Sequence, residues 1–429
     1  MRIVTALYVG LCLVLSTGPL MAQNRIDGQR PDAPELAAPG DLPVGVTTLN
    51  LVNPGQIDLV NATETDAPLY DRPLVVELWY PAAPGTVPGG SYQTILRDGT
   101  TPVTLFGQAS RDAAPAGGSY PLVILSHGYP GNRMLMGHLG ENLASKGYVV
   151  ASIDQTDSTY DSQLAFGSTL VNRPWDQRFV LDALAALEGP VGEMIDADHT
   201  AVIGYSMGGY GALIFAGAGV TADAPALPWT APGGLLGRNV AGSEGLAALH
   251  DDRLKAIIAI GPWGRNAGLF DAAGLAGIGI PLLLVAGSVD DVSMYSAIRQ
   301  IFDETTGTAR MLLTFENANH NAGAPIPSPV EGYAVNAALG WAPFEHYADP
   351  VWDNVRMNNV LQHFATAFLD VNLKGDAAMG RFLDLTERAA DGVWAVDDAG
   401  NPTDAFTYWA GFPNRSAVGL TLERRPAGM

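Results

Sequence analysis

Short apolar runs alternate with amphipathic segments along the middle of this chain. From Pro121 on these runs are almost entirely apolar, which is typical of parallel strands covered on both faces. Strands are expected at Leu74–Tyr80, Leu122–Leu125, Tyr148–Ile153, Ala201–Ile203, Ala256–Ile260, Pro281–Val285 and Met311–Phe315. Helices are expected at Arg133–Lys146, Asp176–Leu187, the small-residue segment after Ser206 through Ala218, Met294–Phe302 and Asn354–Lys374. This alternation predicts an α/β protein with a mostly parallel central sheet and helices on both faces.

The two ends of the chain flank one predicted domain, residues 70–375. Residues 23–69 are expected to form a loose leader and short edge strands, near Val46–Val52 and Ile57–Val60. Residues 376–429 are expected to pack on the domain as a C-terminal extension. Pro81–Gly118 is full of Gly, Pro and Ser, so it is predicted to be a long surface connection.

Two insertions interrupt the alternation, at residues 219–249 and 321–353. The first is rich in Gly, Ala and Pro, and the second is rich in Pro and aromatic residues. Loops at the carboxyl ends of parallel strands border the functional site. Both insertions are therefore candidates for a lid or a pocket wall, with a plain surface excursion as the alternative.

The chain begins with a segment that has the features of an export signal, residues 1–22. Arg2 precedes an apolar core, Ile3–Leu15, and Leu20-Met21-Ala22 offers a small-residue cleavage site. The protein is therefore expected to be secreted or periplasmic, and no later apolar stretch is long enough to span a bilayer. The one cysteine, Cys12, lies inside this signal, so the mature chain would have no disulfide and no thiol ligand.

Acidic residues outnumber basic ones by 44 to 23, a net charge of −21. Removal of Arg2 with the signal leaves 22 basic against 44 acidic residues, or −22. Such a surface repels nucleic acid and anionic lipid headgroups. No His-x-x-x-His or Glu-x-x-His pair is present, so neither a metal nor another cofactor is expected. No pattern indicates the oligomeric state.

A candidate nucleophile lies between the Ala201–Ile203 strand and the helix that follows. Gly204-Tyr205-Ser206-Met207-Gly208 matches the pattern Gly-x-Ser-x-Gly. A sharp turn there lifts the serine hydroxyl clear of the sheet, and the glycines leave room for strand and helix to cross. The string alone is weak in a chain with 50 glycines, but the flanking strand and helix make Ser206 the predicted nucleophile.

A serine hydroxyl needs a base to take its proton. His320 follows the last predicted strand, in a loop of small polar residues that could place an imidazole beside Ser206. His320 is therefore the predicted base, and His346, in the aromatic insertion, is the alternative candidate.

The base in turn needs an acid that holds its tautomer. Asp290 follows the strand at Pro281–Val285 and is the predicted acid. Asp291 remains an alternative, because one of the two aspartates could instead cap the next helix, and Glu316 is a further candidate.

An oxyanion hole is expected from two backbone amides. The first is that of Met207, directly after the nucleophile. The second is that of Tyr129, in the loop Ser126-His127-Gly128-Tyr129-Pro130-Gly131 after an early strand. His127 beside it is expected to brace the loop by hydrogen bonding rather than to act in catalysis.

With these residues in place, the chain resembles the α/β-hydrolases over about residues 70–375. Within them it is similar to the branch of predicted dienelactone hydrolases, platelet-activating-factor acetylhydrolases and cutinase-like polyester hydrolases. The motifs are Leu78-Trp79-Tyr80-Pro81, Ser126-His127-Gly128, Gly147-Tyr148-Val149-Val150 before Asp154, the Gly-Tyr-Ser-Met-Gly-Gly elbow, Asp252–Ala256 leading to Gly261-Pro262-Trp263, and Gly287–Asp290. The chain departs from true dienelactone hydrolases, which use a cysteine nucleophile, and from cutinase-like enzymes, which usually carry a disulfide.

The resemblance implies a triad of Ser206, Asp290 and His320, with Tyr129 and Met207 at the oxyanion hole. It also implies that Trp263 lines the substrate cleft opposite Tyr129, with a core position as the alternative. The expected activity is hydrolysis of a carboxylic ester, small or polymeric, through an acyl-enzyme on Ser206. The alternatives are an amidase of the same fold and a hydrolase-fold protein that binds without catalysis.

Overall fold

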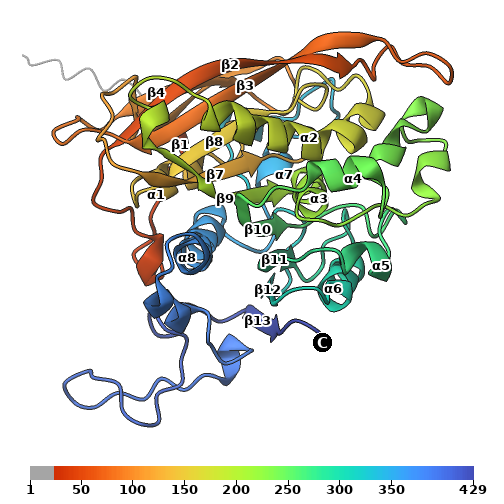
Figure 1. Ribbon diagram of the computed structural model, residues 1–429. Coiled ribbons are helices and arrows are strands. Elements are labelled where there is room, and N and C mark those ends of the chain that lie inside the picture. Colours follow the sequence, from red (N-terminus) through yellow and green to blue (C-terminus); the bar gives the residue numbers. More distant parts are fainter. Residues whose placement is uncertain (1–23) are drawn as a thin grey trace, which may run out of the picture.

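A ten-stranded mixed sheet forms the centre of the protein, whose computed structural model describes residues 24–429. The expected export signal and Cys12 lie outside the described residues. The strand order is β13-β12-β11-β10-β9-β7-β8-β3-β2-β6 (Figure 1). The strands are β2 Val44–Ile57, β3 Leu69–Pro81, β6 Ser110–Arg111, β7 Tyr120–Ser126, β8 Val149–Asp154, β9 Ile195–Tyr205, β10 Leu254–Ile260, β11 Leu282–Gly287, β12 Arg310–Phe315 and β13 Leu420–Arg425. Strands β8, β7, β9, β10, β11 and β12 pair in parallel, as the apolar runs predicted.

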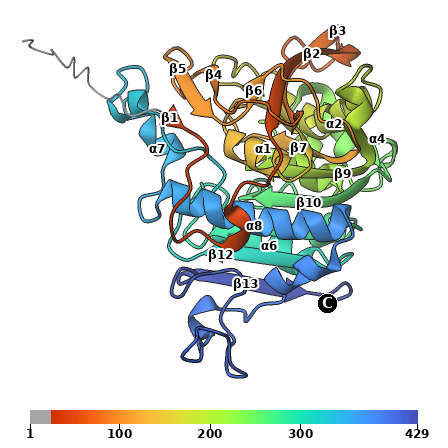
Figure 2. The ribbon, with the colours of Figure 1, turned by 90° about the vertical axis from the view of Figure 1, so that its left-hand side faces the viewer.

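Helices cover both faces of this sheet, and successive strand residues pack on opposite sides. On β7, Val123 joins the core under α1 and α8, while Leu122 joins the core under α2, α3 and α6. Figure 2 shows α8 lying along its face of the sheet. The helices are α1 Gly137–Ala144, α2 Phe166–Ala185, α3 Met207–Phe215, α4 Glu244–Leu249, α5 Ala272–Leu275, α6 Tyr295–Glu304, α7 Phe344–Tyr347 and α8 Asn354–Leu373.

Three sequence expectations are wrong. Pro81–Gly118 is not a plain connection, because it contains β4 Gly90–Ile95 and β5 Pro102–Gly107, which pair with β1 Asn24–Arg25 in a second sheet. No separate strand forms at Ile57–Val60, because Ile57 ends the long strand β2 and a turn follows. Helix α2 begins at Phe166, well before Asp176. The sequence pattern does not reveal this first half, because it buries polar side chains and lacks an apolar stripe.

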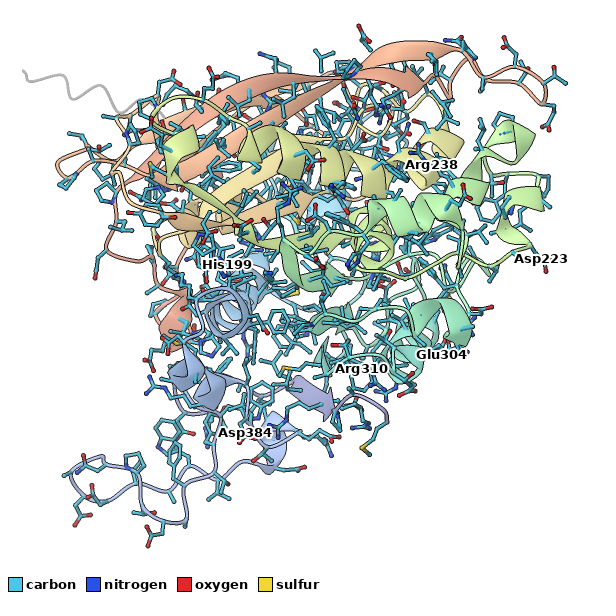
Figure 3. All side chains as sticks on the ribbon, in the orientation of Figure 1. His199, Asp223, Arg238, Glu304, Arg310 and Asp384 are labelled. Atoms are coloured by element: carbon cyan, nitrogen blue, oxygen red, sulfur yellow. The ribbon has the colours of Figure 1, made fainter. Side chains whose placement is uncertain are left out.

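The two ends of the described chain both add strands to the main sheet. β2 pairs antiparallel with β3, and β13 pairs antiparallel with β12 at the opposite edge. Exposed carboxylates such as Asp223 and Asp384 extend from outer loops (Figure 3), in keeping with the acidic composition. Across residues 24–429, no helix is both long enough and apolar enough to cross a membrane.

Candidate active site

Ser206 stands at a sharp turn between β9 and α3. Its backbone has φ 53° and ψ −113°, which non-glycine residues rarely adopt. Hydrogen bonds hold this conformation: the Ser206 amide donates to the Ile260 carbonyl (2.8 Å), and the Ser206 carbonyl accepts from the Tyr210 amide (3.0 Å). The strain is therefore supported by both neighbouring elements, as at the turns that present a catalytic serine.

The glycines on either side of Ser206 allow strand and helix to cross closely. A Cβ atom on Gly204 would lie 2.2 Å from the Gly208 carbonyl oxygen. A Cβ atom on Gly208 would lie 1.8 Å from the Ser126 carbonyl oxygen at the end of β7. Both glycines are thus required by the close approach of backbones, the role that the sequence pattern predicts.

Asp290 and His320 form a hydrogen-bonded pair at the ends of β11 and β12. The distance between His320 Nδ1 and Asp290 Oδ2 is 2.8 Å, and the Asp290 side chain is fully buried. The other carboxylate oxygen, Oδ1, accepts from the amides of Val292 (2.9 Å) and Ser293 (2.8 Å). These bonds fix the carboxylate, which in turn fixes the imidazole with Nε2 left for another partner.

Among the described residues, neither alternative to Asp290 forms a hydrogen bond to His320 through its carboxylate. Asp291 is exposed, and its backbone amide donates to Asn319 Oδ1 (3.1 Å) in the loop after β12. The same oxygen accepts from the His320 amide (2.7 Å), so Asn319 ties the two loops together. Sequence reasoning missed Asn319, because an asparagine in a polar loop gives no periodic signal. Glu316 takes part through its backbone: its carbonyl accepts from the indole of Trp352 (2.8 Å), and its amide donates to the Gly419 carbonyl (2.8 Å).

Ser206 and His320 line one cleft of about 520 Å³. In the described part of the chain no hydrogen bond joins their side chains, an arrangement common in enzymes without substrate. Tyr129 lines the cleft too, and the insertion 321–353 supplies a wall that includes Trp341 and His346.

His346 lines the cleft but is held by a different partner. Its Nε2 atom lies 3.0 Å from the Tyr160 hydroxyl. Burial, with smaller contributions from the charges of Arg97 and His320, lowers the pKa of His346 to about 3. His346 is therefore neutral at ordinary pH and bonded to a tyrosine rather than to a carboxylate.

Hydrogen bonds made by His127 and Arg173 hold the predicted oxyanion loop in place. His127 is completely buried; Nδ1 lies 2.7 Å from the Gly128 carbonyl oxygen, and Nε2 accepts from the Gln155 amide (3.1 Å). Burial holds the pKa of His127 well below its usual range, so the ring is neutral. His127 thus braces the loop, as expected. Arg173 of α2 donates to the His127 carbonyl from the other side.

The two residues predicted to supply the oxyanion hole, Met207 and Tyr129, belong to segments that lie against Ser206. Met207 is the first residue of α3, where backbone amides have no acceptor within the helix. Tyr129 follows Gly128, and a Cβ atom on Gly128 would lie 3.3 Å from Ser206 Cβ. The glycine therefore brings the loop against the nucleophile.

Four aromatic side chains gather beside the cleft. Phe166 contacts Tyr129 and Trp263 edge-on, with ring centroids 5.1 and 5.6 Å apart. Trp229, from the insertion 219–249, lies 6.0 Å from Trp263. Trp263 is half-buried in this cluster, next to the cleft that Tyr129 lines. Phe166 and Trp229 were not singled out from the sequence, because neither stands in a recognisable motif.

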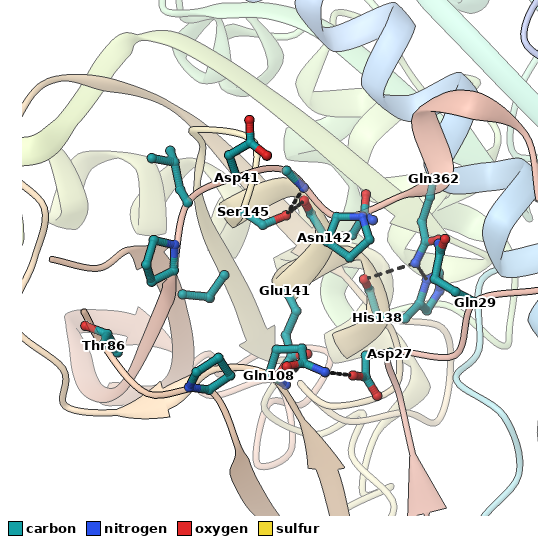
Figure 4. Close-up of a pocket in the computed structure, with 16 residues that line it drawn as sticks. Asp27, Gln29, Asp41, Thr86, Gln108, His138, Glu141, Asn142, Ser145 and Gln362 are labelled. Atoms are coloured by element: carbon teal, nitrogen blue, oxygen red, sulfur yellow. Dashed lines mark hydrogen bonds between the residues drawn. The ribbon is translucent and has the colours of Figure 1, made fainter. Parts of the chain in front are cut away.

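A second cavity, of about 310 Å³, lies between the N-terminal segment and α1 (Figure 4). Its polar groups bond one another: Gln108 donates to Asp27, and Glu141 accepts from the Gln108 amide. Within residues 24–429, no three His, Cys, Asp or Glu side chains form a group able to hold a metal ion.

Known proteins are similar to this chain in sequence and in fold. A family model described as PET hydrolase-like matches residues 107–235. Over 206 residues, 48% of this chain and 54% of the relative, the sequence is 29% identical to Cutinase est1 of Thermobifida alba. Over 113 residues, 26% of this chain and 40% of the relative, it is 37% identical to Cutinase 2 of Thermobifida cellulosilytica. The chain thus spans about half the length of these relatives, or less.

A solved structure covers more of the chain. The ferulic acid esterase from Streptomyces cinnamoneus superposes with a TM-score of 0.57 at 22% identity. The superposition covers 91% of this chain and 99% of that esterase. A likeness at this identity establishes the fold.

Proposed function

We propose that this protein, which has the α/β-hydrolase fold and resembles its cutinase-like branch, hydrolyses carboxylic esters with Ser206 as nucleophile. The observation that carries the proposal is the hydrogen bond between buried Asp290 and partly buried His320, in a cleft that Ser206 also lines. The similarity to cutinases supports ester bonds as the target.

The reaction follows from this geometry. His320 Nε2 takes the Ser206 proton as Oγ attacks the ester carbonyl, and the imidazolium then protonates the departing alcohol. Water, deprotonated by His320, releases the acid and restores the serine. The amides of Met207 and Tyr129 stabilise the oxyanion both when the acyl-enzyme forms and when water cleaves it. One such donor stabilises the transition state by about 2.7–4 kcal/mol.

Esters are favoured over amides as substrates because an alkoxide leaves more readily than an amine. An amidase is the second candidate, because the same groups could cleave an amide, and an amidase too would cleave activated esters. A protein that binds without catalysis would lack one of these groups, whereas all three are present. We also propose that residues 1–22 direct export, so the enzyme would work outside the cytoplasm.

Hydrolysis of 4-nitrophenyl butyrate by the wild type and by Ser206→Ala tests the proposal. The substitution is expected to remove nearly all activity while leaving the fold intact, as judged by circular dichroism and thermal unfolding. Equal rates in the two proteins would refute Ser206 as the nucleophile. An inactive wild type that also fails to bind esters would refute the proposed activity.

A further inference from the structure

Arg97 brings a positive charge into the cleft. It lies in the turn between β4 and β5, within the segment that the sequence predicts to be a surface connection. Its side chain lines the same cleft as Ser206 and His320, and it is the one Lys or Arg among the lining residues described. A partly buried guanidinium in such a position needs a structural or a functional explanation.

No acidic side chain in the described chain pairs with Arg97. The guanidinium lies 5.8 Å from the ring centroid of Trp341, and residues 24–429 provide it with no salt bridge and no side-chain hydrogen bond. The adjacent carboxylate, Asp98, is already used by its own turn. It accepts from the amides of Thr100 (3.0 Å) and Thr101 (2.8 Å) and from the side chain of Asn336 (2.8 Å).

Two carboxylates also line the cleft, but neither pairs with Arg97. Asp291 and Glu345 are both exposed, so water and salt screen their charges. Burial lowers the pKa of Arg97, yet arginine remains charged at neutral pH. The guanidinium is also close to the rings of Tyr129, Tyr160 and Tyr347 and to the neutral imidazole of His346. The cleft thus holds a partly buried cation whose N–H donors form no hydrogen bond to a carboxylate of residues 24–429.

We propose that Arg97 binds an ionised carboxylate of the substrate, so that the preferred esters are those that carry a free carboxylate, such as half-esters of dicarboxylic acids. This inference rests on the proposed esterase function. A carboxylate matches the planar fork of a guanidinium, and the paired charges gain strength where water is excluded. Hydrolysis of a half-ester consumes one water and yields the dicarboxylate, the alcohol and one proton.

The test compares charged and neutral esters of one skeleton. Values of kcat/KM are measured for monoethyl and diethyl adipate, and for 6-acetoxyhexanoate and its methyl ester, so that the carboxylate lies on the acyl or on the alcohol side. The proteins are the wild type, Arg97→Gln, Arg97→Lys and the control Arg388→Gln, which removes an exposed arginine outside the cleft. The readout is kcat/KM for the charged ester divided by kcat/KM for the neutral ester of the same pair.

For at least one pair, Arg97→Gln is expected to lower this ratio by about tenfold or more relative to wild type, because kcat/KM falls much further for the charged ester than for the neutral one, while the melting temperature changes little. Arg97→Lys should keep part of the preference, and Arg388→Gln should keep all of it. The inference is overturned if both pairs give the same ratio in wild type and Arg97→Gln, or if Arg388→Gln lowers it equally. If the wild type then still hydrolyses the neutral esters and Ser206→Ala does not, the proposed esterase function holds without the role given to Arg97.

Discussion

His320 Nδ1 lies 2.8 Å from Asp290 Oδ2, although the two residues are 30 positions apart in the sequence. Each stands just after a parallel strand, and β11 and β12 are neighbours in the sheet. The carboxylate cannot turn away, because its other oxygen accepts two backbone amides. The pair is therefore a fixed unit, which is what a base that must present Nε2 to a serine requires.

Asp290→Asn is expected to lower kcat/KM for 4-nitrophenyl butyrate by about 10⁴-fold. The asparagine oxygen can still accept from Val292 and Ser293, but its NH₂ group would then face His320 Nδ1. The imidazole would carry its proton on Nε2 and could not accept one from Ser206. The control is Asp291→Asn, which alters an exposed carboxylate and should retain most of the activity. A stronger loss in Asp291→Asn than in Asp290→Asn would reverse the assignment.

The acid limb of the pH–rate profile is expected not to depend on His346. The pKa of His346 is lowered to about 3, chiefly by burial, so its ring is neutral near neutral pH. Replacing it in His346→Gln removes no charge there and should leave the midpoint of the kcat/KM profile in place. His320→Gln should reduce the rate to that of Ser206→Ala. A midpoint that moves in His346→Gln would contradict this reading.

Gly208→Ala is expected to be destabilising and inactive. The added Cβ atom would lie 1.8 Å from the Ser126 carbonyl oxygen, so the end of β7 or the start of α3 must shift. Overpacking of this kind costs about 1–3 kcal/mol, or more where backbone is involved. Gly279→Ala, whose Cβ atom would meet nothing within 4 Å, is the control. Thermal unfolding and esterase assays measure both effects, and equal melting temperatures for the two variants would count against the crossing geometry.

Lys146 is expected to make folding stability rise with pH above about 7. Its ammonium group is partly buried and donates to the Leu36 carbonyl, Asn142 and Thr366, and burial lowers its pKa from 10.5 to about 7. Between these values the unfolded chain holds a proton that the folded chain lacks, so the free energy of unfolding increases by up to about 1.4 kcal/mol per pH unit.

Urea unfolding of wild type and Lys146→Met from pH 6 to pH 10 measures this contribution. The advantage of wild type over Lys146→Met should grow as the pH rises from about 7 toward 10.5, because the variant lacks the titrating group. Lys255→Met, at a partly exposed lysine on β10, is the matched control, because it makes the same substitution away from this cluster. A difference between wild type and Lys146→Met that stays constant with pH would show that Lys146 does not titrate in this range.

Sequence reasoning reached the sheet and the turn at Ser206 because both leave local signals. An apolar run of strand length and a Gly-x-Ser-x-Gly string are each legible within a few residues. Asp290 and His320 are far apart, but the rule that functional groups gather at strand carboxyl ends selected both. The structure brings these two residues into contact.

The remaining features depend on packing that the sequence does not encode locally. In β5, Val103 and Leu105 alternate with less buried residues, yet this short strand signal was outweighed by the surrounding glycines and prolines. In α2, Arg173 and Gln177 are buried where an amphipathic helix would place apolar residues. Arg97 has no motif at all, and only the folded cleft shows what lies around it.

The central claim is that Ser206 is activated by the Asp290–His320 pair, and covalent labelling tests it most directly. A fluorophosphonate probe is incubated with wild type, Ser206→Ala and His320→Gln, and the modified peptide is identified by mass spectrometry. The account predicts rapid labelling of wild type on Ser206 alone, none in Ser206→Ala, and labelling slowed by orders of magnitude in His320→Gln. Labelling of wild type on another residue, or at the same rate in His320→Gln, would contradict it.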